Sequence, residues 1–135
     1  MKQLTEYVVG ECLNEVELEP VSRLDLIKYA GASGDYNPIH TIDEEAIKTG
    51  LPGIIAHGMW TMGNLSKLFT DYFDEGFISD YSIRFKGMVF LNDVITLKAI
   101  IKEKQDENIR FTVLAVNQHN QEVLKGHVKY SIYES

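Results

Sequence analysis

The most constraining feature of this sequence is a long helical pattern whose apolar side is too wide to face solvent. The pattern begins at Gly58 and runs to about Asp74. Apolar residues recur in it at spacings of three and four: Met59, Met62, Leu65, Leu68, Phe69, Tyr72 and Phe73. A helix of this kind has to be covered by the rest of the chain, so we expect it to be central and largely buried.

After this helix the sequence changes from a helical period to a period of two. Strands are predicted at about 77–90, 93–104, 109–117 and 122–133, separated by short turn segments rich in Asn and Asp. Connections this short usually join antiparallel neighbours. We therefore expect a four-strand meander in the second half of the chain.

The first half combines one strand with two helices. Residues 11–19 end in an alternation of apolar residues and glutamates, which predicts a half-buried strand. Ser22 and Asp25 have the spacing of a capping box, and Gly34 is a natural end for the helix that follows. Four residues supply its predicted apolar side: Leu24, Leu26, Ile27 and Ala30. A shorter helix is expected at about 43–49, before Gly50.

One strand, one buried helix and a meander predict an α+β architecture in which an antiparallel sheet wraps around the helix. The 135 residues suit a single domain over 1–135 that can bury a core without disulfides or metals. No apolar run approaches the ~20 residues of a transmembrane helix, and the N-terminal residues do not resemble a signal peptide. We expect a cytoplasmic protein with no membrane partner. Its one cysteine, Cys12, is expected to be a free thiol.

The formal net charge of −7 disfavours nucleic acid and anionic membranes as partners. A ligand that carries phosphates needs a local basic cluster instead. Arg84 and Lys86, two residues apart on a predicted strand, are the compact candidates besides Lys67. A solvated strand edge explains the same pair equally well.

Polar groups suited to acid–base chemistry gather around one short segment. Asp35, Asn37 and His40 lie within six residues, and Pro38 disfavours helical geometry at Asn37, which predicts a fixed loop. An ionised Asp accepts a proton, and a neutral His accepts at one nitrogen and donates at the other, so the pair could hold and deprotonate a water. Asp and His beside a helix end more often have structural roles, so spacing alone leaves both interpretations open.

A metal site is the competing chemical interpretation of this segment. Asp35, His40 and His57 could supply three ligands, but no established metal-ligand spacing is present, and we expect no metal. His119 and His127, which fall in a predicted turn and a predicted strand, are not candidates for the site.

Gly58, at the start of the long helix, is the second candidate element. A helix N-terminus presents unpaired N–H groups, and a residue without a side chain lets a ligand approach, so a carbonyl oxygen that becomes negative could be held there. Tight packing of the helix start is the alternative explanation. The sequence contains no Gly-x-Ser-x-Gly, P-loop or dinucleotide fingerprint, so nucleophilic serine catalysis and cofactor redox chemistry have no support.

The strings DYNPIH at 35–40 and AHGM at 56–59, with flanking segments 29–34 and 81–85, occur in an order and spacing that resemble a known family. That family is the MaoC-like hydratases of the hot-dog fold, which includes R-specific enoyl-CoA hydratases and (3R)-hydroxyacyl-ACP dehydratases. The resemblance covers most of the chain. It implies reversible hydration of trans-2-enoyl thioesters to (R)-3-hydroxyacyl thioesters, without a cofactor.

The resemblance assigns roles residue by residue. Asp35 and His40 match the catalytic pair, which holds the water and delivers a proton to the α-carbon. Asn37 matches a residue that fixes the loop, and the N–H of Gly58 matches the donor that polarises the thioester carbonyl. Ser66 matches, more loosely, a serine beside the catalytic aspartate. His57 is expected to be structural.

The resemblance also implies a homodimer, or a higher oligomer of dimers, with an acyl-CoA or acyl-ACP substrate lying along the long helix. Met59 and Trp60 are then candidate substrate contacts, together with Arg84 and Lys86 for the carrier. Trp60 could shorten the acyl pocket or simply pack in the dimer core.

Two other function classes remain open at this level. A hot-dog thioesterase usually has a carboxylate in or near the central helix, whereas this helix has no acid before Asp71. A non-catalytic subunit that supports an active partner would be expected to lack the Asp–His pair, and this chain has both residues.

Overall fold

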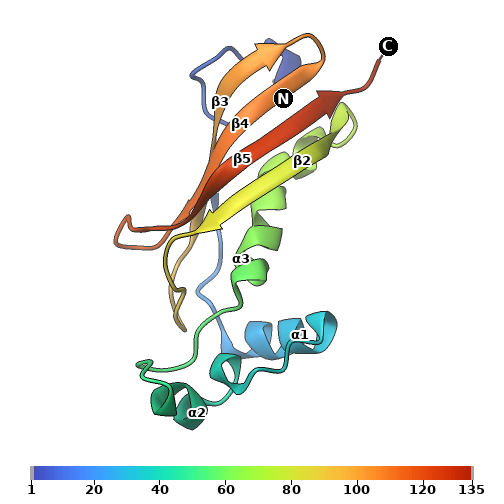
Figure 1. Cartoon of the computed structure of the whole chain (residues 1–135). Coiled ribbons are helices and arrows are strands. Elements are labelled where there is room, and N and C mark those ends of the chain that lie inside the picture. The colour runs from blue at the N-terminus through green and yellow to red at the C-terminus, as the bar shows by residue number, and fades with distance from the viewer. Residues whose placement is uncertain (1, 135) are drawn as a thin grey trace.

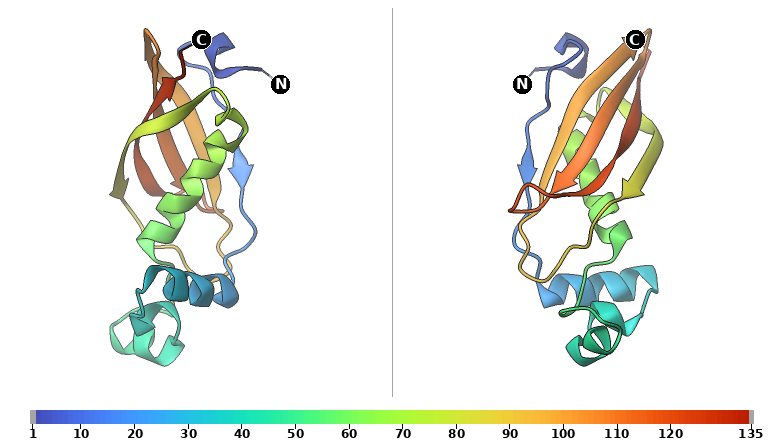
Figure 2. Two further views of the ribbon diagram at one scale, coloured as in Figure 1. Left: turned by 90° about the vertical axis from the view of Figure 1, so that its right-hand side faces the viewer. Right: turned by 60° about the vertical axis from the view of Figure 1, so that its left-hand side comes forward.

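The computed structural model describes residues 2–134 and contains one antiparallel sheet curled around one helix (Figures 1 and 2). The strands are β1 (Val16–Glu17), β2 (Gly76–Phe85), β3 (Thr96–Gln105), β4 (Asn108–Val116) and β5 (Glu122–Ile132). The α-helices are α1 (Arg23–Ser33), α2 (Asp43–Lys48) and α3 (Gly58–Asn64), and the 3-10 helices are η1 (Leu4–Glu6), η2 (Pro38–His40) and η3 (Leu65–Tyr72). The α+β hot-dog architecture expected from the sequence is confirmed.

The order of strands in the sheet is β1-β3-β4-β5-β2. The meander is therefore confirmed for β3, β4 and β5 but wrong for β2, which pairs with β5 and not with β3. Because β2 ends at Phe85 and β3 begins only at Thr96, residues 86–95 are long enough to cross the end of the sheet. The end of β2 lies close to the start of α3, where the ring of Phe85 meets Gly58.

The helix formed by α3 and η3 lies in the concave side of the sheet and supplies the centre of the core (Figure 2). The Phe69 ring packs edge-on against Phe111 and face-on against Tyr130, with ring centroids 5.0 and 5.7 Å apart. The buried Tyr130 hydroxyl donates to the carbonyls of Tyr72 and Gly76, and burial raises its pKa to about 12. The middle of the helix is buried as predicted.

The two ends of the same helix are less covered than the sequence suggested. The side chains of Met59 and Phe73 are 56% and 45% exposed, and Trp60 is half-buried. The apolar residues of this helix that belong to the buried core lie between these ends, at Leu65, Leu68, Phe69 and Tyr72.

The capping box of α1 is confirmed. The amide of Asp25 donates to the Ser22 hydroxyl, the amide of Ser22 donates to the Asp25 carboxylate, and Gly34 ends the helix with φ 78°. The predicted apolar side of α1 is partly wrong, since Leu24 and Ile27 are 57% and 48% exposed. The residues that α1 buries against the rest of the chain are Leu26 and Ala30, about one turn apart.

The predicted N-terminal strand is shorter than expected. Only Val16–Glu17 forms a ladder with β3, and Cys12 makes an isolated bridge to Ile100 with its free thiol exposed. Within residues 2–134, no helix has both the length and the apolar character needed to cross a membrane.

Candidate active site

The segment from Asp35 to His40 is fixed by short polar side chains that each bind a backbone amide further along the chain. The Ser33 hydroxyl accepts from the amide of Asp35, and the Asp35 carboxylate accepts from the amide of Asn37, both at 3.2 Å. The Asn37 side chain accepts from the amide of Ile39, also at 3.2 Å, and caps η2. Pro38 begins η2 with its φ already restricted, so the loop has little freedom.

This loop brings His40 and Asp35 together. Nδ1 of His40 lies 2.7 Å from the carbonyl oxygen of Ile55, which can only accept, so Nδ1 carries the proton and donates. In the neutral ring Nε2 then has a free lone pair, 3.8 Å from Oδ2 of Asp35. That separation is too long for a direct hydrogen bond. Two acceptors so close can instead both accept from one water.

Burial differs between these two groups. The His40 side chain is 10% exposed, whereas the Asp35 side chain is 52% exposed. The histidine is therefore held by the protein, while the carboxylate remains within reach of solvent.

His57 stacks on His40, with ring centroids 3.8 Å apart and an interplanar angle of 22°. Nε2 of His57 donates to the carbonyl oxygen of Asp35 at 3.1 Å, and the Tyr29 ring packs edge-on against it. Burial lowers the pKa of His57, although the hydrogen bond to Asp35 opposes this shift. A neutral His57 therefore supports both the ring of His40 and the backbone of the loop.

The same three residues are the group within residues 2–134 that could hold a metal ion. The candidate ligand atoms of Asp35, His40 and His57 lie within 4.8 Å of one another. However, a histidine binds a metal in the plane of its ring, and two stacked rings point their lone pairs along parallel planes. This stacking does not suit two ligands of one ion, so the arrangement favours acid–base chemistry.

A cavity of about 180 Å³ lies between the start of α3, the end of β2 and the start of β5. Its lining residues are His40, Ile55, Ala56, Gly58, Thr61, Phe85, Gly87, Met88, Val89, Val123 and Leu124. Most of this wall is apolar, and its polar groups come from His40, the backbone of Gly58 and Thr61. Asp35 does not line the cavity and is connected to it through His40.

Gly58 is packed directly beneath the ring of Phe85. A Cβ atom at this position would lie 2.8 Å from Cε1 of Phe85, which is closer than real side chains approach. As the first residue of α3, Gly58 has no intrahelical acceptor for its N–H. The missing side chain therefore allows the contact with Phe85, and the position at the helix start leaves a free donor beside the cavity.

Other residues predicted for the site lie elsewhere in this chain. The Ser66 hydroxyl donates to the Gly63 carbonyl at 2.8 Å, and Ser66 does not line the cavity. Met59 and Trp60 are also absent from the cavity wall.

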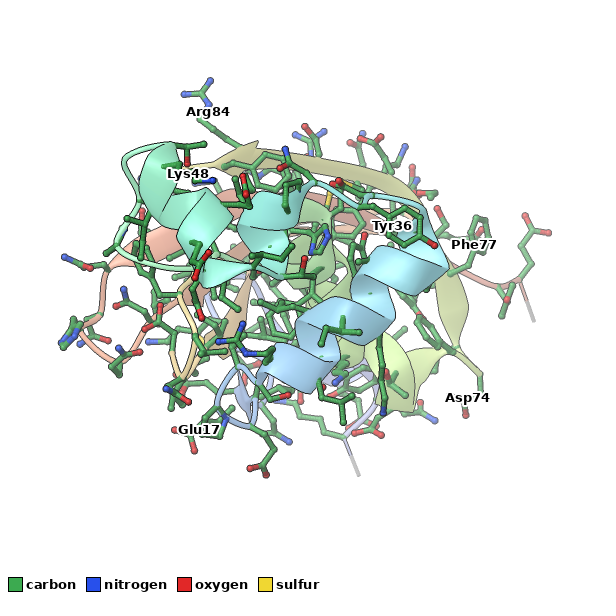
Figure 3. The ribbon with its side chains drawn as sticks, turned by 90° about the horizontal axis from the view of Figure 1, so that it is seen from below. Glu17, Tyr36, Lys48, Asp74, Phe77 and Arg84 are labelled. Carbon is green, nitrogen blue, oxygen red and sulfur yellow. The ribbon has the colours of Figure 1, made fainter. Side chains whose placement is uncertain are left out.

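Arg84 and Lys86 line a separate groove of about 480 Å³ on the sheet face turned away from the helix. Figure 3 shows Arg84 projecting from the ribbon into solvent, and Lys86 forms a 2.6 Å ion pair with Glu122. The groove also contains Lys125 and His127, which sequence reasoning did not connect with Arg84.

Of the cavity residues named above, only His40 and Gly58 were predicted for the site, and Thr61 and Phe85 are the two missed residues that bear most on it. Thr61 follows Gly58 by three positions, so helical spacing was an available signal that both face the same way. Phe85 had no such signal, because its contact with Gly58 depends on how β2 and α3 meet.

The fold and the site define a hot-dog protein with a close Asp–His pair beside the start of its central helix. The chain belongs to the MaoC-like domain family, whose family model matches residues 6–123.

The chain is also similar to individual proteins whose names describe hydratases or dehydratases. The mitochondrial 3-hydroxyacyl-[acyl-carrier-protein] dehydratase of Arabidopsis thaliana is 27% identical over 120 residues, which cover 86% of this chain and 71% of that protein. The 3-hydroxybutyryl-CoA dehydratase of Methylorubrum extorquens is 31% identical over 101 residues, covering 73% and 64%. Among solved structures, the unliganded R-hydratase PhaJ1 from Pseudomonas aeruginosa matches with a TM-score of 0.88 at 26% identity, over 97% of this chain and 85% of that one.

Proposed function

We propose that this chain is a hydro-lyase that reversibly adds water to trans-2-enoyl thioesters and yields (R)-3-hydroxyacyl thioesters. The observation that carries this proposal is the pair of acceptors formed by His40 Nε2 and Asp35 Oδ2, 3.8 Å apart, of which His40 lines a mostly apolar cavity. The relatives named as dehydratases of 3-hydroxyacyl-[acyl-carrier-protein] and 3-hydroxybutyryl-CoA support the same substrate class.

In the hydration direction, His40 and Asp35 act on one water. The water donates one hydrogen bond to Nε2 and one to the carboxylate, which leaves an oxygen lone pair free to attack the β-carbon. A C–O bond forms, the C=C electron pair moves toward the α-carbon and the carbonyl, and the released proton stays on the pair. Protonation of the α-carbon completes the addition. The two groups titrate as a coupled unit.

Gly58 acts on the other end of the substrate. As the β-carbon is attacked, negative charge grows on the thioester carbonyl oxygen, and the N–H of Gly58 donates to it. The apolar wall that includes Phe85 and Leu124 limits competing hydrogen bonds from solvent.

The carrier of the acyl group is proposed to place its phosphates in the basic groove, defined by Ser82, Arg84, Lys86, Lys125 and His127. Arg84 lies directly opposite Lys125 across β2 and β5, and like charges so placed destabilise a sheet unless an anion neutralises them. Neither residue forms an ion pair within residues 2–134.

The groove and the cavity meet at one strand end. Arg84 and Lys86 line the groove, whereas Phe85 and Gly87 line the cavity. The flexible pantetheine arm shared by CoA and acyl carrier protein can therefore connect a phosphate in the groove with a thioester in the cavity.

A cytoplasmic homodimer, or an oligomer of such dimers, is the assembly we propose. β2 is an edge strand of the sheet in this chain, and an uncovered edge strand is a template for pairing. Phe77 and Phe85 on this strand are 48% and 52% exposed, and Figure 3 shows Phe77 at the periphery. Pairing through β2 would cover both rings.

The test is loss of enoyl absorbance with crotonyl-CoA, longer enoyl-CoAs and the matching acyl-carrier-protein thioesters. Asp35→Asn and His40→Gln should each lower kcat by roughly 10²–10⁴-fold, the usual contribution of a positioned acid or base. Asp106→Asn and His119→Gln, at exposed positions in two turns away from the site, are the matched controls and should retain activity.

Wild-type protein that hydrates none of these thioesters would overturn the proposed function. Full activity of Asp35→Asn and His40→Gln would overturn the site instead. Chiral analysis of the product checks the R configuration.

A further inference from the structure

Thr61 is a buried polar residue whose hydroxyl has no hydrogen-bond partner in the described part of the chain. The residue is 1% exposed and lies on α3, one turn after Gly58. A helical threonine often bonds to the carbonyl four residues earlier. Here that carbonyl, of His57, accepts from the amide of Trp60 at 3.1 Å.

An unpartnered hydroxyl in this position costs free energy, because it has lost its water and gained nothing in return. Valine has nearly the same shape and would fill the space without that cost. The unused donor lies at the wall of the cavity that Gly58 and His40 also line. These facts point to a partner that the substrate supplies.

We propose that the Thr61 hydroxyl donates a hydrogen bond to the thioester carbonyl oxygen, as a second donor beside the N–H of Gly58. This assignment rests on the proposed function. Residues three apart on a helix are neighbours, so the two donors can converge on one oxygen. The other lining residues besides His40 have apolar side chains or no side chain, so they offer the carbonyl no competing side-chain donor.

The attacking water is the poorer partner, because a hydroxyl that donated to its oxygen would withdraw electron density from the atom that attacks the β-carbon. His40 Nε2 and Asp35 Oδ2 are both acceptors and already use the two hydrogens of the attacking water. The carbonyl oxygen is stabilised by hydrogen-bond donors, and this stabilisation increases as negative charge develops on it during the addition. Thr61 transfers no proton in this role and only strengthens an existing hydrogen bond.

The kinetic test compares Thr61→Val with Thr61→Ser, using crotonyl-CoA. Removing one donor of this kind typically costs ~10²–10³-fold in kcat, so Thr61→Val should lose about 10²-fold while the Gly58 donor remains. Thr61→Ser keeps the hydroxyl and should retain most activity. Thr112→Val, on the face of β4 away from the helix, is the matched control and should leave kcat unchanged.

Two results would overturn the proposal. One is a kcat of Thr61→Val that equals the kcat of the wild type. The other is equal impairment of Thr61→Ser, which keeps the hydroxyl, and Thr61→Val, which lacks it, because the loss would then not follow the hydroxyl. Thermal unfolding distinguishes this role from a packing role. Thr61→Val should be at least as stable as the wild type, whereas loss of packing would lower the stability.

A spectroscopic measurement separates this proposal from the proposed function. Sorboyl-CoA bound to Asp35→Asn should absorb at longer wavelength than free sorboyl-CoA, because carbonyl donors polarise the conjugated system. Asp35→Asn/Thr61→Val should show a smaller shift, and an equal shift would refute the role of Thr61. Binding and polarisation need no turnover, so this result stands even if the wild type hydrates nothing.

Discussion

The two stacked histidines differ in which ring nitrogen carries the proton. His40 donates from Nδ1 to Ile55, which leaves Nε2 free to face Asp35. His57 donates from Nε2 to Asp35, which leaves Nδ1 buried without a partner within residues 2–134. The carbonyl oxygen that each ring faces determines which of its nitrogens carries the proton. His40 is therefore a candidate base, whereas His57 is a neutral support.

His57 predicts a pH dependence of stability. The unfolded chain protonates His57 near its ordinary pKa of 6.5, whereas burial lowers that pKa in the folded chain. Between these two values the unfolded state binds more protons, so the free energy of unfolding falls as the pH falls. Denaturant unfolding from about pH 7.5 to about pH 5.5 should show this loss, with a smaller slope in His57→Gln. Identical slopes in the two proteins would contradict this explanation.

At the scale of elements, the start of α3 and the end of β2 control access to the cavity together. The Tyr81 hydroxyl on β2 donates to the Met62 carbonyl on α3, and Phe85 covers Gly58. Gly58→Ala should therefore lower kcat/KM, because the new methyl group displaces the half-exposed ring of Phe85 and narrows the approach to the N–H. Adding Phe85→Ala to the Gly58→Ala variant should remove this obstruction and recover part of the lost kcat/KM. Such a non-additive effect is typical of residues in contact.

Gly63→Ala is the matched control for this prediction. It lies on the same helix with open space around its Cα. Alanine at an unobstructed helical position usually stabilises by about 0.5–1 kcal/mol, so Gly63→Ala should keep its activity and unfold at a slightly higher temperature. Equal kcat/KM for Gly58→Ala and wild type would show that contact with Phe85 is not what requires glycine.

Local signals in the sequence predicted most elements but not all of their neighbours. The capping box at Ser22 and the glycine at Gly34 placed α1 within a residue, because both act through nearby backbone groups. Periodicity did not reveal which apolar residues of α1 would be covered, since that depends on the elements packed against Leu26 and Ala30. It also did not reveal that β2 pairs with β5, because strand pairing over this distance leaves no local pattern.

The same limit applies to the site. Asp35 and His40 were predicted because they share one short loop, and the family resemblance raised them above other polar pairs. Thr61 and Phe85 were not predicted, because their significance comes from a cavity formed by separate elements.

For the molecule as a whole, one local patch has the opposite sign to the net charge. The chain has a net charge of −7, yet the basic groove collects Arg84, Lys86 and Lys125 on one face. Arg84→Glu/Lys125→Glu should raise KM for crotonyl-CoA on the order of tenfold or more, since one hydrogen bond to a charged group contributes ~1.5–3 kcal/mol. The effect should shrink at high salt.

Two controls sharpen this measurement. Lys28→Glu/Lys102→Glu changes the net charge equally at exposed positions outside the groove and should leave KM unchanged. Crotonyl-N-acetylcysteamine carries the thioester without phosphates, so its KM should not respond to Arg84→Glu/Lys125→Glu. An equal rise in KM for both substrates would exclude phosphate binding in the groove.

The pairing of β2 with β5 has a consequence for the order in which the protein is made. Gly76 pairs with Ile132, and 132 − 76 gives a separation of 56 residues. During synthesis, Asp35, His40 and Gly58 emerge long before the strand that holds β2 in place. Contacts this distant in sequence also form slowly, because a long loop has to close first. We therefore expect the residues proposed to carry the chemistry to become a working site only when the last strand is complete.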